Sequence, residues 1–244
     1  MKQLDTYKMI EYDKDRIDDF RNEVFYQYQR ACPTQFERKT INDLMCNKKI
    51  TSLFNEIDLQ MEIDRVGIGD NLITHNSFYD KNRVIISLLI GFSYGLDSDK
   101  SIPLYYAAGY LNCAQENDDE VELGASSKKA RELLKSKFNE EDIHKIEALI
   151  DICEMEKNVG TLEEENIEAI YQKYNIENTD YSYLNTFKQI INDSVELSNL
   201  MISDDLFDFY RLETTPARKL LDLSLSIKNK EMLDKTAGTK HKKR

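Results

Sequence analysis

The chain consists mainly of segments in which apolar residues recur every three or four positions, with charged residues between them. In the first such segment, residues 16–31, Phe20 and Val24 belong to an apolar series of this kind. That spacing is typical of an α-helix with one buried face. It predicts further helices at residues 50–63, 80–95, 104–113, 126–137, 141–157, 162–174, 184–201 and 215–235.

The segment from Asp80 to Gly95 is apolar nearly all round, which is the pattern of a helix at the centre of a bundle. Glycine and proline are scarce (8 and 3 residues), and few stretches alternate with the period of two that predicts strands. We therefore predict an all-α fold, a single helical bundle domain of about nine helices. We expect residues 1–65 to form an N-terminal helical cap packed on a core at 66–235, followed by a basic, flexible tail at 236–244.

Local signals refine some boundaries and loops. Pro103 suits the first turn of the helix at 104–113, and Thr161 with Glu164 has the spacing of a capping box. The two glycines of residues 66–70 lack the count and the preceding strand of a dinucleotide-binding loop. Residues 175–183 are polar and are expected to form a loop.

The charge of the chain, −12, argues against a partner that is a nucleic acid, because such binding requires cationic residues that displace counterions from phosphates. The basic tail, Lys240–Arg244, is interpreted as a solvated terminus. The longest apolar run, Val84–Ile90, is too short to span a bilayer, and the first 20 residues lack the apolar region of a secretory signal. We expect a cytosolic protein, or one exported by a route that needs no such signal.

The four cysteines are widely spaced, at positions 32, 46, 113 and 153, and none forms a CxxC pair. A structural zinc site is therefore not expected, and no metal or cofactor is predicted. Cys113 and Cys153 lie in apolar helical stretches and are interpreted as small core residues.

Three separated stretches carry a resemblance to a known family. They are Asn76-Ser77-Phe78-Tyr79-Asp80-Lys81-Asn82-Arg83-Val84, Ala107-Ala108-Gly109-Tyr110-Leu111-Asn112-Cys113-Ala114-Gln115-Glu116, and Ile191-Asn192-Asp193-Ser194-Val195-Glu196-Leu197, followed by Leu206-Phe207-Asp208-Phe209-Tyr210. In order and spacing they resemble the phosphodiesterase domain of the SidE-type bacterial effectors, whose helical core is HD-like. The resemblance covers roughly residues 70–215.

The departures from the family pattern concern the residues that carry its chemistry. Where the family has histidines, this chain has Asn76, Asp80, Leu111 and Asn192. Asn112 and Val195 replace family aspartates, and only Glu116 and Asp193 stand as the family has them. An imidazole can transfer a proton near neutral pH or attack phosphorus, whereas Asn and Leu can do neither. The resemblance therefore implies a pocket without the usual phosphodiester chemistry.

Three ionisable residues are considered for roles at this pocket. His75 lies one position before the expected histidine and is either a solvent-exposed loop residue or an assisting group. Asp193 lies in a helix among apolar and amide side chains, where an ionisable group requires a partner, and the resemblance suggests Arg83. His144 belongs to a charged amphipathic helix and is expected at the surface.

Three hypotheses follow. The favoured one is a catalytically degenerate phosphodiesterase-like domain that acts by binding, with a vestigial pocket formed by Asn76, Asp80, Arg83, Asn112, Glu116, Asn192 and Asp193. The resemblance implies an effector in a host cytosol, with ubiquitin or a nucleotide-modified protein as partner. The second is a hydrolase with a rebuilt site that uses Glu116 or Asp193 as base, assisted by His75. The third is a helical interaction module in which Leu111 and Val195 fill the position of the family's pocket. Its candidate surface is formed by Tyr171, Tyr174, Tyr181 and Tyr183.

Overall fold

The computed structural model describes residues 47–64, 66, 77–115, 122–202, 204–221, 224, 225 and 228. This part of the chain is helical and contains no strand, which confirms the all-α class. Its helices are α3 (Lys48–Ile63), α4 (Ser77–Ser93), α5 (Ile102–Tyr110), α6 (Ala125–Leu134), α7 (Glu140–Val159), α8 (Glu164–Lys173) and α9 (Tyr181–Ile202). Four short 3₁₀ turns accompany them, η1 (Asp99–Ser101), η2 (Asn178–Asp180), η3 (Asp204–Leu206) and η4 (Phe209–Arg211), and residues 215–221 are again helical.

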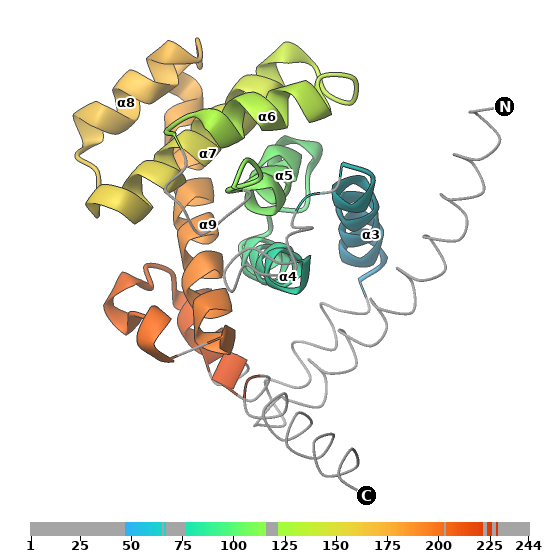
Figure 1. The fold of residues 1–244 in the computed structure, drawn as a ribbon, viewed down its shortest axis with the longest axis vertical. Coiled ribbons are helices and arrows are strands. Elements are labelled where there is room, and N and C mark those ends of the chain that lie inside the picture. The colour runs from blue at the N-terminus through green and yellow to red at the C-terminus, as the bar shows by residue number, and fades with distance from the viewer. Residues whose placement is uncertain are drawn as a thin grey trace, which may run out of the picture.

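Helix α9 is the longest element and runs beside α4 and α5, while α6, α7 and α8 gather at one end of the bundle (Figure 1). The contacts of α4 with α9 and with α5 are the most extensive between helices. Both α4 and α5 bury almost every side chain that the structure describes in them, as expected for helices at the centre of a bundle.

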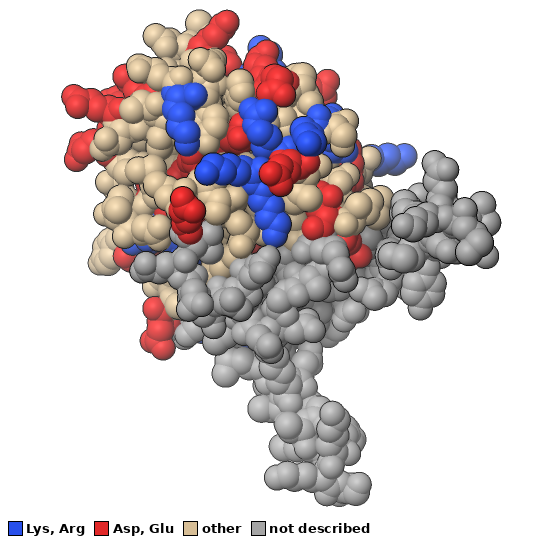
Figure 2. All heavy atoms as spheres, turned by 45° about the horizontal axis from the view of Figure 1, so that its top comes forward, with Lys and Arg blue, Asp and Glu red and all other residues tan. Residues whose placement is uncertain are grey.

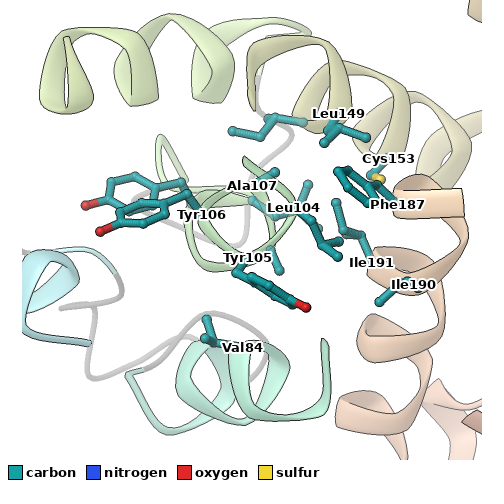
Figure 3. Close-up of a cluster of buried hydrophobic side chains, with 14 of the residues drawn as sticks. Val84, Leu104, Tyr105, Tyr106, Ala107, Leu149, Cys153, Phe187, Ile190 and Ile191 are labelled. Carbon is teal, nitrogen blue, oxygen red and sulfur yellow. The ribbon is translucent and has the colours of Figure 1, made fainter. Parts of the chain in front are cut away.

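The centre of the core is formed by side chains of four helices. Leu104, Tyr105 and Ala107 of α5 meet Val84 of α4, Leu149 of α7 and Ile191 of α9 there (Figure 3). Tyrosine takes the place of larger aromatics in a chain without tryptophan, and Tyr105 sends its hydroxyl to the backbone carbonyl of Leu96 at 2.7 Å. The apolar body of the Tyr105 ring is therefore buried while its hydroxyl forms a hydrogen bond.

Helix α3 is the described part of the segment predicted to form an N-terminal cap, and it packs against α4 and α5. Helices α3 and α5 pack closely at Gly109 of α5, where a Cβ atom would lie 2.9 Å from Sδ of Met61 on α3. Lys81 on α4 also forms buried ion pairs with Asp58 at 2.9 Å and Glu62 at 2.7 Å on α3. The division at residue 65 and the tail at 236–244 remain predictions.

The helix boundaries differ from the predicted ones at several places; α4, for example, spans Ser77–Ser93 rather than 80–95, and α6 ends at Leu134 rather than at residue 137. Helix α5 ends at Tyr110 rather than at residue 113, because the chain turns into a left-handed conformation at Asn112. The capping box is wrong: α8 begins after Glu163, and no side chain caps it. The predicted loop at 175–183 contains η2, and α9 already begins at Tyr181.

Lysines, arginines and acidic residues are interspersed on the face seen in Figure 2, without a broad region of one sign. Among the described helices, none is long and apolar enough to cross a membrane. Of the tyrosines proposed as an interaction surface, Tyr171 is fully buried with its ring 4.7 Å from that of Tyr181, whereas Tyr174, Tyr181 and Tyr183 are half-buried. Larger exposed apolar side chains occur elsewhere, at Leu206, Phe209 and Tyr210.

Candidate functional site

The turn after α5 is held by the fully buried guanidinium of Arg83. This group donates to the backbone carbonyls of Ala108, of Gly109 at 3.3 Å and of Leu111 at 3.0 Å. The last carbonyls of a helix have no partner within it, so Arg83 caps the end of α5. Asp80 lies 2.9 Å from the same guanidinium, and burial raises the pKa of this carboxyl to about 6 although Arg83 opposes the shift.

This cap directs the chain into Asn112, whose backbone is left-handed with φ 60°. Asparagine adopts that conformation at less cost than most residues with a side chain. The N–H of Asn112 donates to Oε1 of Glu154 on α7 at 3.1 Å. Burial raises the pKa of Glu154, partly offset by hydrogen bonds from Ser126 and from this N–H. The turn and α7 are thus joined by a buried carboxylate.

A cavity of about 530 Å³ lies between this turn, α7, α9 and the segment that follows α9. It is within the size range of small-molecule sites. Its lining combines apolar, amide and charged side chains from segments far apart in the sequence. The lining residues are Tyr79, Leu111, Asn112, Cys153, Glu154, Glu156, Lys157, Gly160, Thr161, Asn192, Val195, Glu196, Asn199, Leu206, Tyr210, Arg211 and Glu213.

The wall contributed by α9 consists of four residues at helical spacing, Asn192, Val195, Glu196 and Asn199. Residues separated by three or four positions lie on the same side of a helix, which explains why all four reach one cavity. The amide oxygen of Asn199 accepts a hydrogen bond from the hydroxyl of Tyr79 at 2.9 Å. This bond connects the α9 wall to α4.

Glu156 on α7 is surrounded by donors. Lys188 lies 2.9 Å from its Oε1, and the backbone N–H of Leu162 donates to the same atom at 3.3 Å. The Nδ2 group of Asn192 donates to Oε2 at 2.6 Å. Both carboxylate oxygens are therefore engaged by the protein, and Glu156 acts as a buried link between α7 and α9.

The segment after α9 forms the rim of the cavity and is held by Glu196. This carboxylate accepts from the N–H of Asp208 at 3.1 Å and lies 3.5 Å from the guanidinium of Arg211. Asp208 in turn accepts from the N–H of Tyr210 at 2.9 Å and so caps the short turn η4. Tyr210 is 93% exposed although it lines the cavity, so its ring stands at the mouth.

Lys157 differs from Arg211, the other cation of the lining, which pairs with Glu196. Its side chain is exposed, and its pKa is lowered by partial burial and then by the nearby charge of Arg83, with Glu154 acting in the opposite direction. No carboxylate in the part of the chain that the structure describes lies within ion-pair distance of its Nζ. The amine is therefore available to the cavity.

The structure brings together some of the predicted site residues. Asn112 and Asn192 line the cavity, as do Leu111 and Val195, which also occupy positions where the family has functional residues. The cavity beside Leu111 and Val195 disagrees with the hypothesis that these two side chains fill the site. Asn76, Glu116 and His75 lie outside the described residues.

Other predicted residues lie behind the cavity wall rather than in it. Asp80 and Arg83 are buried and do not line the cavity. The predicted pairing of Asp193 with Arg83 is wrong: Asp193 is fully buried and accepts from the backbone N–H groups of Glu213 at 2.7 Å and Thr214 at 2.9 Å. It therefore anchors the backbone just before the helical segment at 215–221, whose N-cap is Thr214: the Thr214 hydroxyl oxygen accepts from the N–H of Ala217 at 3.2 Å.

Sequence reasoning missed the wall that α7 contributes, formed by Cys153, Glu154, Glu156 and Lys157. Cys113 and Cys153 are buried free thiols, as predicted, and burial raises the pKa of both. The polar residues of α7 have the pattern of a solvated helix face, so periodicity alone gives no sign of a cavity. The sequence signal that could have indicated this wall is the spacing of Cys153, Glu154 and Lys157, which places them on one side of the helix.

The polar side chains that line the cavity can form hydrogen bonds with a ligand. His144, the histidine among the described residues, lies on α7 outside the lining, partly exposed and 3.7 Å from Glu140. Within the described ranges, no three His, Cys, Asp or Glu side chains are grouped so that they could hold a metal ion. Comparisons with protein families, with curated proteins and with solved structures found no match to this chain.

Proposed function

We propose that this chain is a catalytically degenerate phosphodiesterase-like domain that acts by binding a small polar ligand or a modified side chain in the cavity. The observation that carries the proposal is the convergence of the stretches with the family resemblance. Leu111 and Asn112 come from the second stretch and Asn192 and Val195 from the third, about 80 residues later, yet all four line one cavity. Tyr210 of the downstream stretch stands at its mouth.

The state of the carboxylates favours binding over catalysis. A general base must reach the proton that it removes from the substrate. Glu156 has both oxygens occupied by protein donors, Glu196 holds the rim, and Asp193 binds the backbone N–H groups of Glu213 and Thr214. No imidazole occurs among the lining residues, so the described wall lacks the group that the family uses.

One observation favours the alternative, a hydrolase with a rebuilt site. Burial raises the pKa of Glu154 in the cavity wall, and a raised pKa is typical of carboxylates that act as acids or bases. In this alternative Glu154 takes the role that the sequence assigned to Glu116 or Asp193. Turnover that requires Glu154 is the outcome that separates the two functions.

The resemblance also directs the choice of ligand. It implies an effector that works in a host cytosol and recognises ubiquitin or a nucleotide-modified protein, and we retain both as parts of the proposal. The amide groups of Asn112 and Asn192 can hydrogen-bond phosphate or sugar oxygens. Tyr210 offers an exposed aromatic ring at the mouth.

The test is native mass spectrometry of the protein with ADP-ribosylated ubiquitin and with unmodified ubiquitin, followed over time. Val195→Phe places a large ring in the cavity, and Val159→Phe is the matched control, because Val159 is 70% exposed and does not line it. We expect a complex without turnover that Val195→Phe weakens and Val159→Phe leaves unchanged. Release of AMP or of a phosphoribosylated product, abolished by Glu154→Gln, would instead establish the hydrolase.

A complex with equal affinity for both ubiquitin forms and for the Val195→Phe variant would contradict the cavity as the binding site. Absence of any complex or product would contradict the proposed ligand. Circular dichroism and thermal unfolding of each variant show whether a loss of binding reflects a loss of fold.

A further inference from the structure

The cavity has one cation that forms no ion pair with the described residues. Lys157 lines the cavity, and the described residues supply no carboxylate within 4.0 Å of its Nζ. By contrast, Lys188 is paired with Glu156 at 2.9 Å, and Arg211 lies 3.5 Å from Glu196. Lys157 is therefore the lining cation that remains available to a ligand.

The acidic groups nearest to Lys157 along α7 are directed elsewhere. Glu154, one turn earlier, is held by the N–H of Asn112 at 3.1 Å and by the hydroxyl of Ser126. Glu156 is held by Lys188 and Asn192. On α7, a ligand in the cavity thus meets two carboxylates that already accept hydrogen bonds, Glu154 and Glu156, and the Lys157 ammonium group, which makes none to described residues.

Further donors line the same cavity as Lys157. Thr161 follows Lys157 by four positions, just beyond the end of α7 at Gly160, and lines the cavity. Asn112 is tied through its backbone to Glu154, which lies one turn from Lys157 on the same side of α7. In the described structure neither the Thr161 hydroxyl nor the Asn112 side chain has a hydrogen-bond partner.

We propose that Lys157, with the Asn112 amide and the Thr161 hydroxyl, forms a subsite for a compact oxyanion, the phosphate or carboxylate group of the cavity ligand. An ammonium group and two neutral donors match the acceptor oxygens of such a group, and charge-assisted hydrogen bonds are the stronger kind. This inference rests on the proposed function in that it places one end of a ligand in the same cavity.

The charges around the subsite agree with this assignment. The nearby guanidinium of Arg83 and partial burial both lower the pKa of Lys157, so the ammonium form gains stability when an anion binds beside it. The chain as a whole carries −12, so it repels anions except where a cation faces them. Binding at the subsite should therefore weaken as the salt concentration rises.

The experiment is a titration of the full chain with inorganic phosphate and with acetate at constant ionic strength, followed by NMR of the backbone amides. Lys157→Met keeps the length of the side chain and removes its charge. Lys135→Met is the matched control, because Lys135 is exposed, lies in the turn after α6, and has no ion pair with described residues. Chloride serves as the reference anion.

We expect saturable shifts of the Asn112, Gly160 and Thr161 amides, with affinity lowered about tenfold or more in Lys157→Met and unchanged in Lys135→Met. A preference for phosphate identifies a phosphate-bearing ligand, and a preference for acetate identifies a carboxylate. Absence of saturable shifts for both anions would overturn the subsite, as would equal affinities of Lys157→Met and the wild-type protein.

The failure of this inference can be told apart from the failure of the proposed function. A ligand that Val195→Phe excludes but Lys157→Met binds normally would leave the binding function intact and remove the anion subsite. Anion binding that depends on Lys157, in a protein that captures no form of ubiquitin, would support the subsite and contradict the proposed ligand.

Discussion

Helix α9 has two sides that meet different surroundings. Ile190 and Ile191 are fully buried in the apolar core among α5 and α7 side chains (Figure 3). Asn192 and Asn199, by contrast, line the cavity. Residues recur with helical periodicity on both sides, but this pattern predicts burial only for the apolar side. A polar helix face has the same sequence pattern whether it lies against bulk water or against a cavity.

Helix α7 repeats this division. Leu149 and Ile150 are fully buried, and Glu154 and Lys157 face the cavity. The apolar sides of the two helices provide stability through the area that they remove from water, while their polar sides leave room for a ligand. The comparison predicts that substitutions on the core side affect folding and that substitutions on the cavity side affect binding.

The largest expected effect is the loss of Arg83 from the buried side of the cavity wall. In Arg83→Met the carbonyls at the end of α5 lose their donors, and Asp80 is left as a buried carboxyl without its partner. We expect a loss of about 3–5 kcal/mol in the free energy of unfolding, measured with urea. Lys157→Met, which removes a cation on the cavity side, should cost less than about 1 kcal/mol. Equal losses would contradict the comparison.

The next effect contrasts the two sides of α9 directly. Ile191→Ala leaves a void in the packed core and should reduce the free energy of unfolding by about 2–5 kcal/mol. Val195→Ala enlarges an existing cavity and should cost about 1 kcal/mol or less. Both values come from the same urea titration. A cost for Val195→Ala as large as that for Ile191→Ala would show that the cavity side is also tightly packed.

A smaller effect concerns pH and the ion pair between α3 and α4. Burial raises the pKa of Asp58 from 3.8 to about 6, with Lys81 opposing the shift. Because the folded state holds this proton more tightly than the unfolded state, the stabilising contribution is complete below pH 3.8 and is lost as pH rises through about 6.

The measurement is the free energy of unfolding of the wild-type protein and of Asp58→Asn between pH 4 and pH 7. The difference between them should change by at most about 1.4 kcal/mol per pH unit, with the wild-type protein losing relative stability as pH rises. A difference that does not depend on pH, or that grows in favour of the wild-type protein, would contradict the raised pKa.

The smallest effect tests the role of Asp193 as an anchor for the backbone before the helical segment at 215–221. Asp193→Ala removes the acceptor for the N–H groups of Glu213 and Thr214 and should cost about 1–2 kcal/mol in the free energy of unfolding. Asp193→Asn keeps one oxygen acceptor and should cost less. Neither variant should change ligand binding once it is folded. A selective loss of turnover in Asp193→Asn, with the fold intact, would return Asp193 to the catalytic role that the structure does not support.

The helices predicted between residues 50 and 201 correspond to those of the described structure, because each buries an apolar stripe that is visible in its own residues. The helix predicted at 16–31 lies outside the described residues, and the one at 215–235 is described only in part. The errors fall at the ends. Nothing local shows that α5 stops at Tyr110, since its last carbonyls are capped by Arg83 from a distant part of the chain. Thr161 has the spacing of a cap, yet it lines the cavity and α8 begins after Glu163.

The candidate site was predictable in part. The resemblance placed Asn112 and Asn192 in one pocket, and both line the cavity. It also suggested an ion pair between Arg83 and Asp193, whereas Arg83 pairs with Asp80 in the structure. The carboxylates and the lysine of α7 carry no motif, and their position in the cavity depends on how α7 packs against α5 and α9.

From the sequence alone follow the all-α class, the central position of α4 and the absence of histidine at the positions that resemble the family's site. These properties depend on residue identity and on a period of 3.6 residues, which are local to each segment. Only the tertiary structure decided which polar helix faces meet across the cavity and which charges find partners. Those outcomes depend on distances between segments that lie tens of residues apart, and the packing of the apolar sides sets these distances.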